Sequence, residues 1–127
     1  MIGRARAVLG ALALGAAVAA CEPRGPGSLN ATVEAPGPTG AVVIELAGQR
    51  MTSFEGVGGT RTFATQGSPA DTLRRVVVVS PAGVELRFRI AVEDIGADPP
   101  RAAVVDAVDP SNLKVPTLTG YRVKISR

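Results

Sequence analysis

The chain has 127 residues, of which 46% are hydrophobic, 3% aromatic and 20% charged, with one Cys and no His or Trp. This length suits one small domain. The lack of His removes imidazole metal ligands, the Ser-His-Asp and Cys-His nucleophile systems, and the commonest general base near neutral pH. We therefore expect a protein that is not an enzyme and that uses no cofactor.

Residues 1–20 have the anatomy of a secretory signal peptide. Arg4 and Arg6 form a short positive region, and an uncharged run of 14 residues rich in Ala, Leu and Val follows from Ala7 to Ala20. A membrane-spanning helix needs roughly 20 apolar residues, so this run is short for one. Small residues directly before Cys21 are typical of a cleavage site. We expect a signal helix that is removed; a buried core helix or a membrane anchor is the alternative.

The residues Val18-Ala19-Ala20-Cys21 resemble the lipobox of bacterial lipoproteins, in which a hydrophobic and two small residues precede an obligatory Cys. The family's usual first residue is Leu, so Val18 departs from it. The resemblance implies cleavage before Cys21, a diacylglyceryl group on its sulfur and usually an acyl group on the new amino terminus. Two or three acyl chains hold a protein stably at a membrane. Glu22 stands where an Asp tends to signal inner-membrane retention, which favours the outer membrane.

Removal of residues 1–20 leaves 12 Lys and Arg against 11 Asp and Glu, with the two signs interspersed. This balance gives no electrostatic basis for binding nucleic acid, so we expect no such partner. From Cys21 to Ser28 the chain is rich in Pro and Gly and has no periodic apolar residues. The pattern predicts a flexible linker at 21–28 and a folded domain at 29–127.

The composition of the mature part favours strands separated by turns. After residue 20 there are 15 Val against 6 Leu, and all ten Pro lie there. Residues with branched Cβ atoms suit pleated, half-buried surfaces. Alternation of apolar and polar residues, bounded by Gly, Pro, Asn and Asp, predicts the following strands: 29–34, 41–47, 51–57, 60–65, 74–80, 84–92, 102–108 and 121–126.

The strongest pattern lies between residues 74 and 92. Four consecutive Val at 76–79 indicate a central strand that is covered on both faces. Pro81 and Gly83 then fit a tight turn, so the strands 74–80 and 84–92 should form a β-hairpin. The second strand alternates without error, and these residues should point inward: Val84, Leu86, Phe88, Ile90 and Val92.

About seven or eight short antiparallel strands over roughly 100 residues predict an all-β immunoglobulin-like β-sandwich. A small barrel is the alternative. Phe63, Phe88 and Tyr121 fit core or strand positions of such a fold. From Val84 onward, an amphipathic strand, an acidic Pro loop, an Ala/Val strand and an Asp-Pro-Ser-Asn turn resemble the later half of cohesin-like sandwich domains. This resemblance covers about 30 residues without a specific motif, and no dockerin-binding role is transferred from it.

Two groups of polar residues are candidate sites. Asp94 and Asp98 lie in one loop and Asp106 and Asp109 lie around the next turn, so the two loops are candidates to share a Ca²⁺ ion. Asp also caps turns, and this is the reading we favour, so no metal site is expected. The second group would form a cationic patch across the predicted hairpin, and it consists of Arg74, Arg75, Arg87 and Arg89. Surface charge of this kind more often protects strand edges.

The sequence thus predicts a non-enzymatic, lipid-anchored protein of the bacterial cell envelope. It would reach the membrane, the outer rather than the inner one, through lipid on Cys21. Its sandwich domain would make protein–protein or structural contacts with another envelope protein. The alternative function is a ligand- or Ca²⁺-binding module on the cell surface, of the cohesin-like or carbohydrate-binding kind.

Overall fold

The computed structural model describes residues 23–65, 72–81 and 84–127, so the predicted signal helix and Cys21 lie outside the described residues. Every described regular element is a strand. The eight strands are β1 (Gly27–Glu34), β2 (Ala41–Ala47), β3 (Met51–Val57), β4 (Arg61–Ala64), β5 (Leu73–Val79), β6 (Arg87–Val92), β7 (Arg101–Val108) and β8 (Arg122–Ser126).

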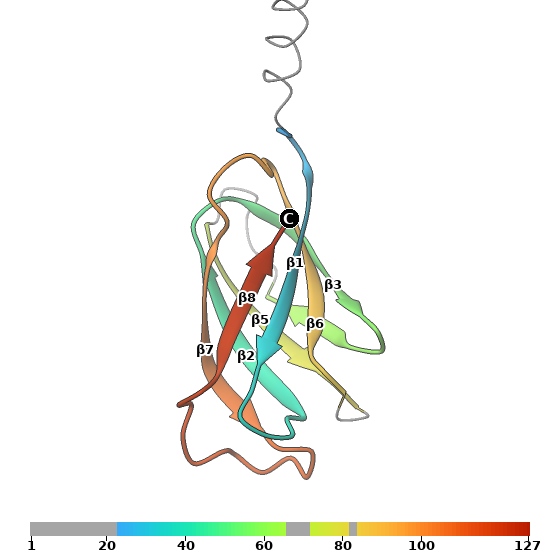
Figure 1. Ribbon diagram of the computed structural model, residues 1–127, viewed down its shortest axis with the longest axis vertical. Coiled ribbons are helices and arrows are strands. Elements are labelled where there is room, and N and C mark those ends of the chain that lie inside the picture. Colours follow the sequence, from blue (N-terminus) through green and yellow to red (C-terminus); the bar gives the residue numbers. More distant parts are fainter. Residues whose placement is uncertain (1–22, 66–71, 82–83) are drawn as a thin grey trace, which may run out of the picture.

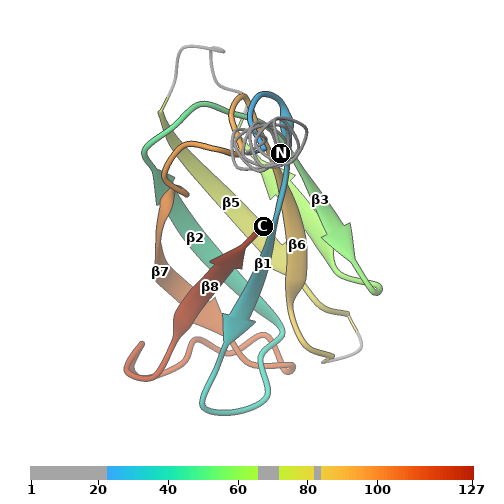
Figure 2. The ribbon, with the colours of Figure 1, turned by 45° about the horizontal axis from the view of Figure 1, so that its top comes forward.

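The strands form two four-stranded antiparallel sheets that pack face to face (Figures 1 and 2). One sheet has the order β3-β6-β1-β8 and the other the order β4-β5-β2-β7. The prediction of an all-β sandwich is therefore confirmed. The pairs β2–β5, β5–β4 and β3–β6 match the B–E, E–D and C–F pairs of immunoglobulin domains, but β7 and not β1 lies beside β2, so the strand order departs from that of immunoglobulin domains at β1 and β7. The first strand lies between β6 and β8, so the beginning and the end of the domain share one sheet.

The core lies between the two sheets and consists of the inward-facing residues, which alternate with outward-facing residues along each strand. Phe88 and Ile90 of β6 are 1% and 0% exposed, as the alternation predicted. The other buried apolar residues are Leu29, Ala31, Val33, Val42, Ile44, Leu46, Met51, Val76, Val78, Leu86, Val92 and Ala107. Burial of apolar surface on this scale is the main favourable contribution to folding. Tyr121, Val123 and Ile125 are half-buried and pack against this cluster.

The hairpin predicted from residues 74–92 is wrong. β5 pairs with β2 and β4, whereas β6 pairs with β1 and β3, so the two strands lie in different sheets. A turn that contains Pro serves equally well in a hairpin and in a connection between sheets, because it fixes the local backbone but not the partner strand. Val84, in this connection, is 47% exposed and does not point inward as predicted.

Phe63 occupies a strand position, one of the two kinds that the sequence predicted, but it is 59% exposed because it lies on the outer face of the short edge strand β4. The cationic patch, which was the less favoured alternative for the four arginines, does not form, since Arg74 and Arg75 lie on β5 and the other two on β6, in the opposite sheet.

Arg74 instead holds the two sheets together near one edge. Its guanidinium donates hydrogen bonds to the backbone carbonyl oxygens of Met51 and Thr65, each at 2.9 Å. The guanidinium carbon also lies 5.3 Å from the centre of the Phe54 ring, within the range of a cation–π interaction. Met51 and Phe54 belong to β3 in one sheet, and Arg74 belongs to β5 in the other. This charged side chain therefore has a structural role that its neighbour Arg75 does not share.

Candidate functional site

The four candidate calcium ligands are divided between the two ends of the sandwich. Asp94 and Asp98 lie in the loop before β7, and Asp109 follows β7 at the other end (Figure 1). An eight-residue strand is about 26 Å long, so one ion cannot bridge the two loops. Within the described ranges, no three His, Cys, Asp or Glu side chains gather closely enough to hold a metal ion.

Asp106 and Asp109 have their carboxylates engaged by nearby backbone. Asp109 Oδ1 accepts hydrogen bonds from the amides of Ser111 at 2.9 Å and Leu113 at 3.0 Å. Asp106 Oδ1 accepts one from the amide of Ala107 at 2.9 Å. These bonds shape the turn after β7 and the bulge within β7, which is the turn-capping role that Asp commonly has.

Asp94 joins the segment before β1 to the loop after β6. Its Oδ1 accepts hydrogen bonds from the amides of Gly96 at 2.9 Å and Gly25 at 3.0 Å. The carbonyl oxygen of Gly25 in turn accepts a hydrogen bond from the amide of Ile95 at 2.9 Å. Part of the predicted linker is therefore attached to the domain, and β1 begins already at Gly27. Cys21 is four residues from Gly25, a reach of at most about 14 Å.

These contacts predict the titration of Asp94. The hydrogen bond from Gly96, then that from Gly25, and weaker attraction to Arg24 and Arg127 hold the pKa of Asp94 below its usual value. The stabilisation is therefore complete above the ordinary Asp pKa of about 3.9 and is lost as pH falls through the lower, folded pKa. An NMR titration of the carboxyl carbon should give this lowered pKa, and a value at or above the ordinary one would contradict the assignment.

A matched pair of variants tests the same link at neutral pH. Asp94→Ala removes the acceptor, so hydrogen exchange at the Gly25 amide should become faster. Asp94→Asn keeps an acceptor oxygen and should preserve more of the protection. An exchange rate in Asp94→Ala equal to that of the wild type would show that the side chain does not hold this segment.

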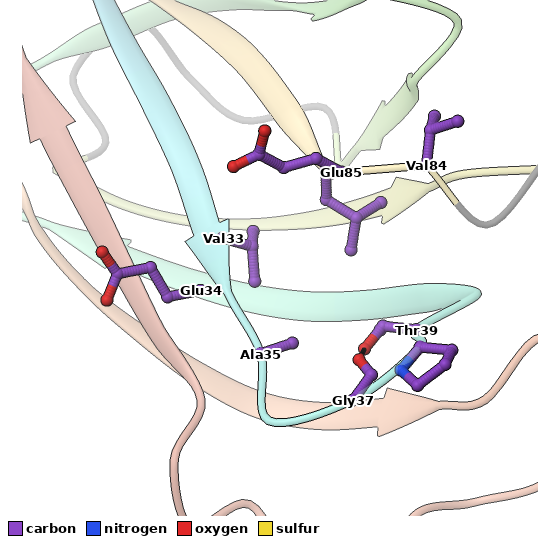
Figure 3. Close-up of a pocket in the computed structure, with 9 residues that line it drawn as sticks. Val33, Glu34, Ala35, Gly37, Thr39, Val84 and Glu85 are labelled. Carbon is purple, nitrogen blue, oxygen red and sulfur yellow. Dashed lines mark hydrogen bonds between the residues drawn. The ribbon is translucent and has the colours of Figure 1, made fainter.

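A shallow pocket of about 330 Å³ lies at the other end of the domain, between the β1–β2 connection and the segment before β6 (Figure 3). It is lined by Val33, Glu34, Ala35, Gly37, Pro38, Thr39, Val84, Glu85 and Leu86. Thr39 donates a hydrogen bond to the carbonyl of Gly37 at 3.0 Å and lies 3.3 Å from the Tyr121 hydroxyl. In Figure 3 the carboxylates of Glu34 and Glu85 turn away from the Thr39 side. Small-molecule sites usually have polar groups that converge on the ligand, and these carboxylates do not.

The outer faces of the two sheets differ in chemistry. The outer face of the β3-β6-β1-β8 sheet is here called the polar face. Its residues are identified from the strand register, because they alternate along each strand with the residues that point into the core. It carries Ser28, Asn30, Thr32, Glu34, Glu55, Val57, Arg87, Arg89, Ala91, Arg122, Lys124 and Ser126. Such a face is compatible with full exposure to water.

The outer face of the β4-β5-β2-β7 sheet, here called the apolar face, is largely hydrophobic. Its apolar residues are Ala41, Val43, Ala47, Phe63, Leu73, Val77, Val79, Ala103, Val105 and Val108, and its charged residues are Glu45, Arg61, Arg75, Arg101 and Asp106. Phe63 and Leu73 are each 59% exposed and Val105 is 40% exposed. Contiguous exposed apolar surface of this kind marks interaction sites.

Two of the four consecutive Val residues of β5 lie on the apolar face. Four consecutive Val predicted a strand covered on both faces. Val76 and Val78 are fully buried in the core, whereas Val77 and Val79 are only half-buried on the apolar face. Among the described residues, the inner face of β5 is therefore covered by packed side chains, whereas its outer face is not covered as the sequence predicted. Sequence reasoning found the strand but did not identify Phe63 of the neighbouring β4, or Val105 of β7, as exposed residues of the same face.

Comparisons with known proteins give no indication of function, so a functional proposal rests on the residues of this chain. No protein-family model matches the chain, and neither the curated proteins nor the solved structures give a significant match. No helix long and apolar enough to cross a membrane occurs in the described parts of the chain.

Proposed function

We propose that this protein is a lipid-anchored, non-enzymatic protein of the bacterial cell envelope that binds protein through its apolar face. The single observation that carries the binding role is the contrast between the two outer faces. The polar face has eight charged or hydroxyl-bearing side chains on β1, β6 and β8 alone, among them Thr32, Arg89 and Lys124. The apolar face instead exposes Phe63 and Leu73 to solvent. Burial of such a hydrophobic surface against a partner lowers the free energy and so favours the complex.

The chemistry of the side chains supports a role without catalysis. The chain has no His, and its one Cys is the proposed lipid attachment site. Three of the four candidate acidic residues accept hydrogen bonds from backbone amides, which suits shaping of turns better than proton transfer. No cofactor is part of the proposal.

The anchoring proposal rests on Cys21 and on the lipobox-type residues before it. The attached segment at Gly25 would hold the domain within a short distance of the membrane, with the β6–β7 loop at the near end (Figure 1). Glu22 in place of Asp favours the outer membrane over the inner one. The pocket beside Thr39 would then face away from the anchored end.

Fractionation of cells tests the anchor. The wild-type chain should sediment with membranes, and Cys21→Ala should leave unprocessed precursor or a soluble protein because the sulfur that carries the lipid is absent. Globomycin, which blocks cleavage of lipoprotein precursors, should cause the precursor to accumulate. Ser28→Ala is the matched control, since Ser28 is an exposed residue at the start of β1 and lies outside the lipobox. Unchanged membrane partition of Cys21→Ala would disprove lipid anchoring at this residue.

A further inference from the structure

We infer that the partner on the apolar face is a second copy of this chain, related by a two-fold axis that runs parallel to the strands between β2 and β5. This inference deepens the proposed protein-binding function and rests on it. It follows from the charged and apolar residues of the two central strands, β2 and β5, which are complementary row by row under this rotation.

The row that contains the charges shows the complementarity most directly. Arg75 of β5 and Glu45 of β2 are register partners, and their side chains form an ion pair at 3.0 Å. Their side chains remain 60% and 36% exposed, so both have surface left to contact a partner. The proposed axis places β5 of one copy opposite β2 of the other within the same row. Each Arg75 then faces Glu45 of the second copy, and each Glu45 faces Arg75.

The apolar rows match under the same rotation. Val77 and Val43 are register partners, and the axis places Val77 of one copy against Val43 of the other. The outer strands β4 and β7 also become opposite, so that Phe63 faces the row of Asp106 of the second copy, with the bulge residue Val105 beside it. Val105 is the extra residue of the bulge where the β2–β7 register shifts, and it projects into solvent in the single chain.

Anchoring of both copies in one membrane favours this axis over a two-fold axis that runs across the strands. An axis parallel to the strands keeps the Gly27 ends of both copies at the same end of the dimer, so two anchored chains fit one membrane. An axis across the strands would place these ends on opposite sides. Such an axis through the Arg75–Glu45 row would place Arg75 opposite Arg75 and Glu45 opposite Glu45, so that like charges face each other.

The size of the face suits a weak dimer on a membrane. Strands of four to eight residues give a face whose two copies would bury roughly 800 Å² in total. Specific interfaces below about 1,200 Å² are typically transient. Anchoring in one membrane raises the effective concentration of the two copies, which favours association without further contacts. Two aligned sheets also pack face to face at about 10 Å, as the two sheets within a sandwich do.

Charge reversal in the full chain tests the axis. Two copies with different C-terminal tags are co-expressed, crosslinked in intact cells before solubilisation in mild detergent, and co-purified through one tag. Glu45→Arg alone gives four cations in the interface, Arg75→Glu alone gives four carboxylates, and each should lower co-purification by about tenfold or more. Co-expression of Glu45→Arg with Arg75→Glu restores opposite charges between the copies. This mixed pair should co-purify to within about twofold of wild type.

A matched pair on the polar face is the control. Glu55 and Arg89 are register partners between β3 and β6, so Glu55→Arg and Arg89→Glu disturb an equivalent pair without touching the apolar face. They should leave co-purification unchanged. Absence of wild-type co-purification, unaffected co-purification of the single variants, a loss that the mixed pair does not restore, or an equal loss in the control would each overturn the dimer.

The anchoring and the dimer fail separately in this design. The same pull-down is repeated with Cys21→Ala in both copies, together with fractionation of the cells. Membrane-bound chains that do not co-purify overturn the dimer and leave the anchor intact. Soluble chains whose charge variants show loss and restoration support the dimer even where the anchor fails.

Discussion

Phe88→Ala is expected to lower the free energy of unfolding by about 3–5 kcal/mol. Phe88 is 1% exposed, and it has the largest volume of the fully buried side chains. It lies on β6 between its register partners Ala31 of β1 and Gly56 of β3, which are both small. Neither neighbour can fill the space that truncation would leave, so the loss should include both the transfer of the ring and a cavity. Urea unfolding followed by circular dichroism measures the change.

The same truncation at Phe63 is the control, because its ring is 59% exposed. We expect Phe63→Ala to change the free energy of unfolding by less than about 1 kcal/mol, measured at dilution, where a weak dimer dissociates. Equal losses at the two positions would contradict the assignment of inner and outer faces. A loss below about 1 kcal/mol at Phe88 would contradict its place in the core.

The strands were predictable because each sheet buries one face, which imposes a period of two on the sequence. β2 at Ala41–Ala47 and β3 at Met51–Val57 have the bounds that the alternation predicted. The sheet to which each strand belongs was not predictable in this way. Alternation fixes which residues of a strand point inward, and it is identical whether the next strand returns in the same sheet or crosses to the other. The segment from β5 to β6 is the case in which this ambiguity gave a wrong hairpin.

The candidate surface was only partly predictable for the same reason. The four Val of β5 indicated a strand that needs two covers. The neighbours that complete the apolar face, Phe63 and Val43, come from strands whose register depends on the whole sheet. Val105 lies at a bulge, where the extra residue departs from the simple alternation. The four acidic residues illustrate the opposite error. Their residue types are those of a Ca²⁺ site, but the fold places them at both ends of the domain, too far apart to share one ion.

Gly56→Ala is expected to destabilise the domain by about 3 kcal/mol, because the added methyl group would overlap backbone that cannot move independently. At Gly56 the edge strand β3 turns over into β4, and the carbonyl of Thr60 lies where a Cβ atom would be. The amide of Arg61 is also only 3.1 Å from that position. Thr62 Oγ1 closes this corner with a hydrogen bond to the Phe54 carbonyl at 3.3 Å.

The corner joins the two sheets, so its distortion should affect both, and urea unfolding should show a lower midpoint with a similar slope. Gly37→Ala is the matched control, since a Cβ at Gly37 meets no atom within 4 Å and its backbone φ is not in the left-handed region. This change should be neutral or slightly stabilising, because Ala restricts the unfolded chain more than Gly does. A neutral effect at Gly56 would show that β3 and β4 do not approach each other closely at this edge, and the sandwich would then be open where the structure closes it.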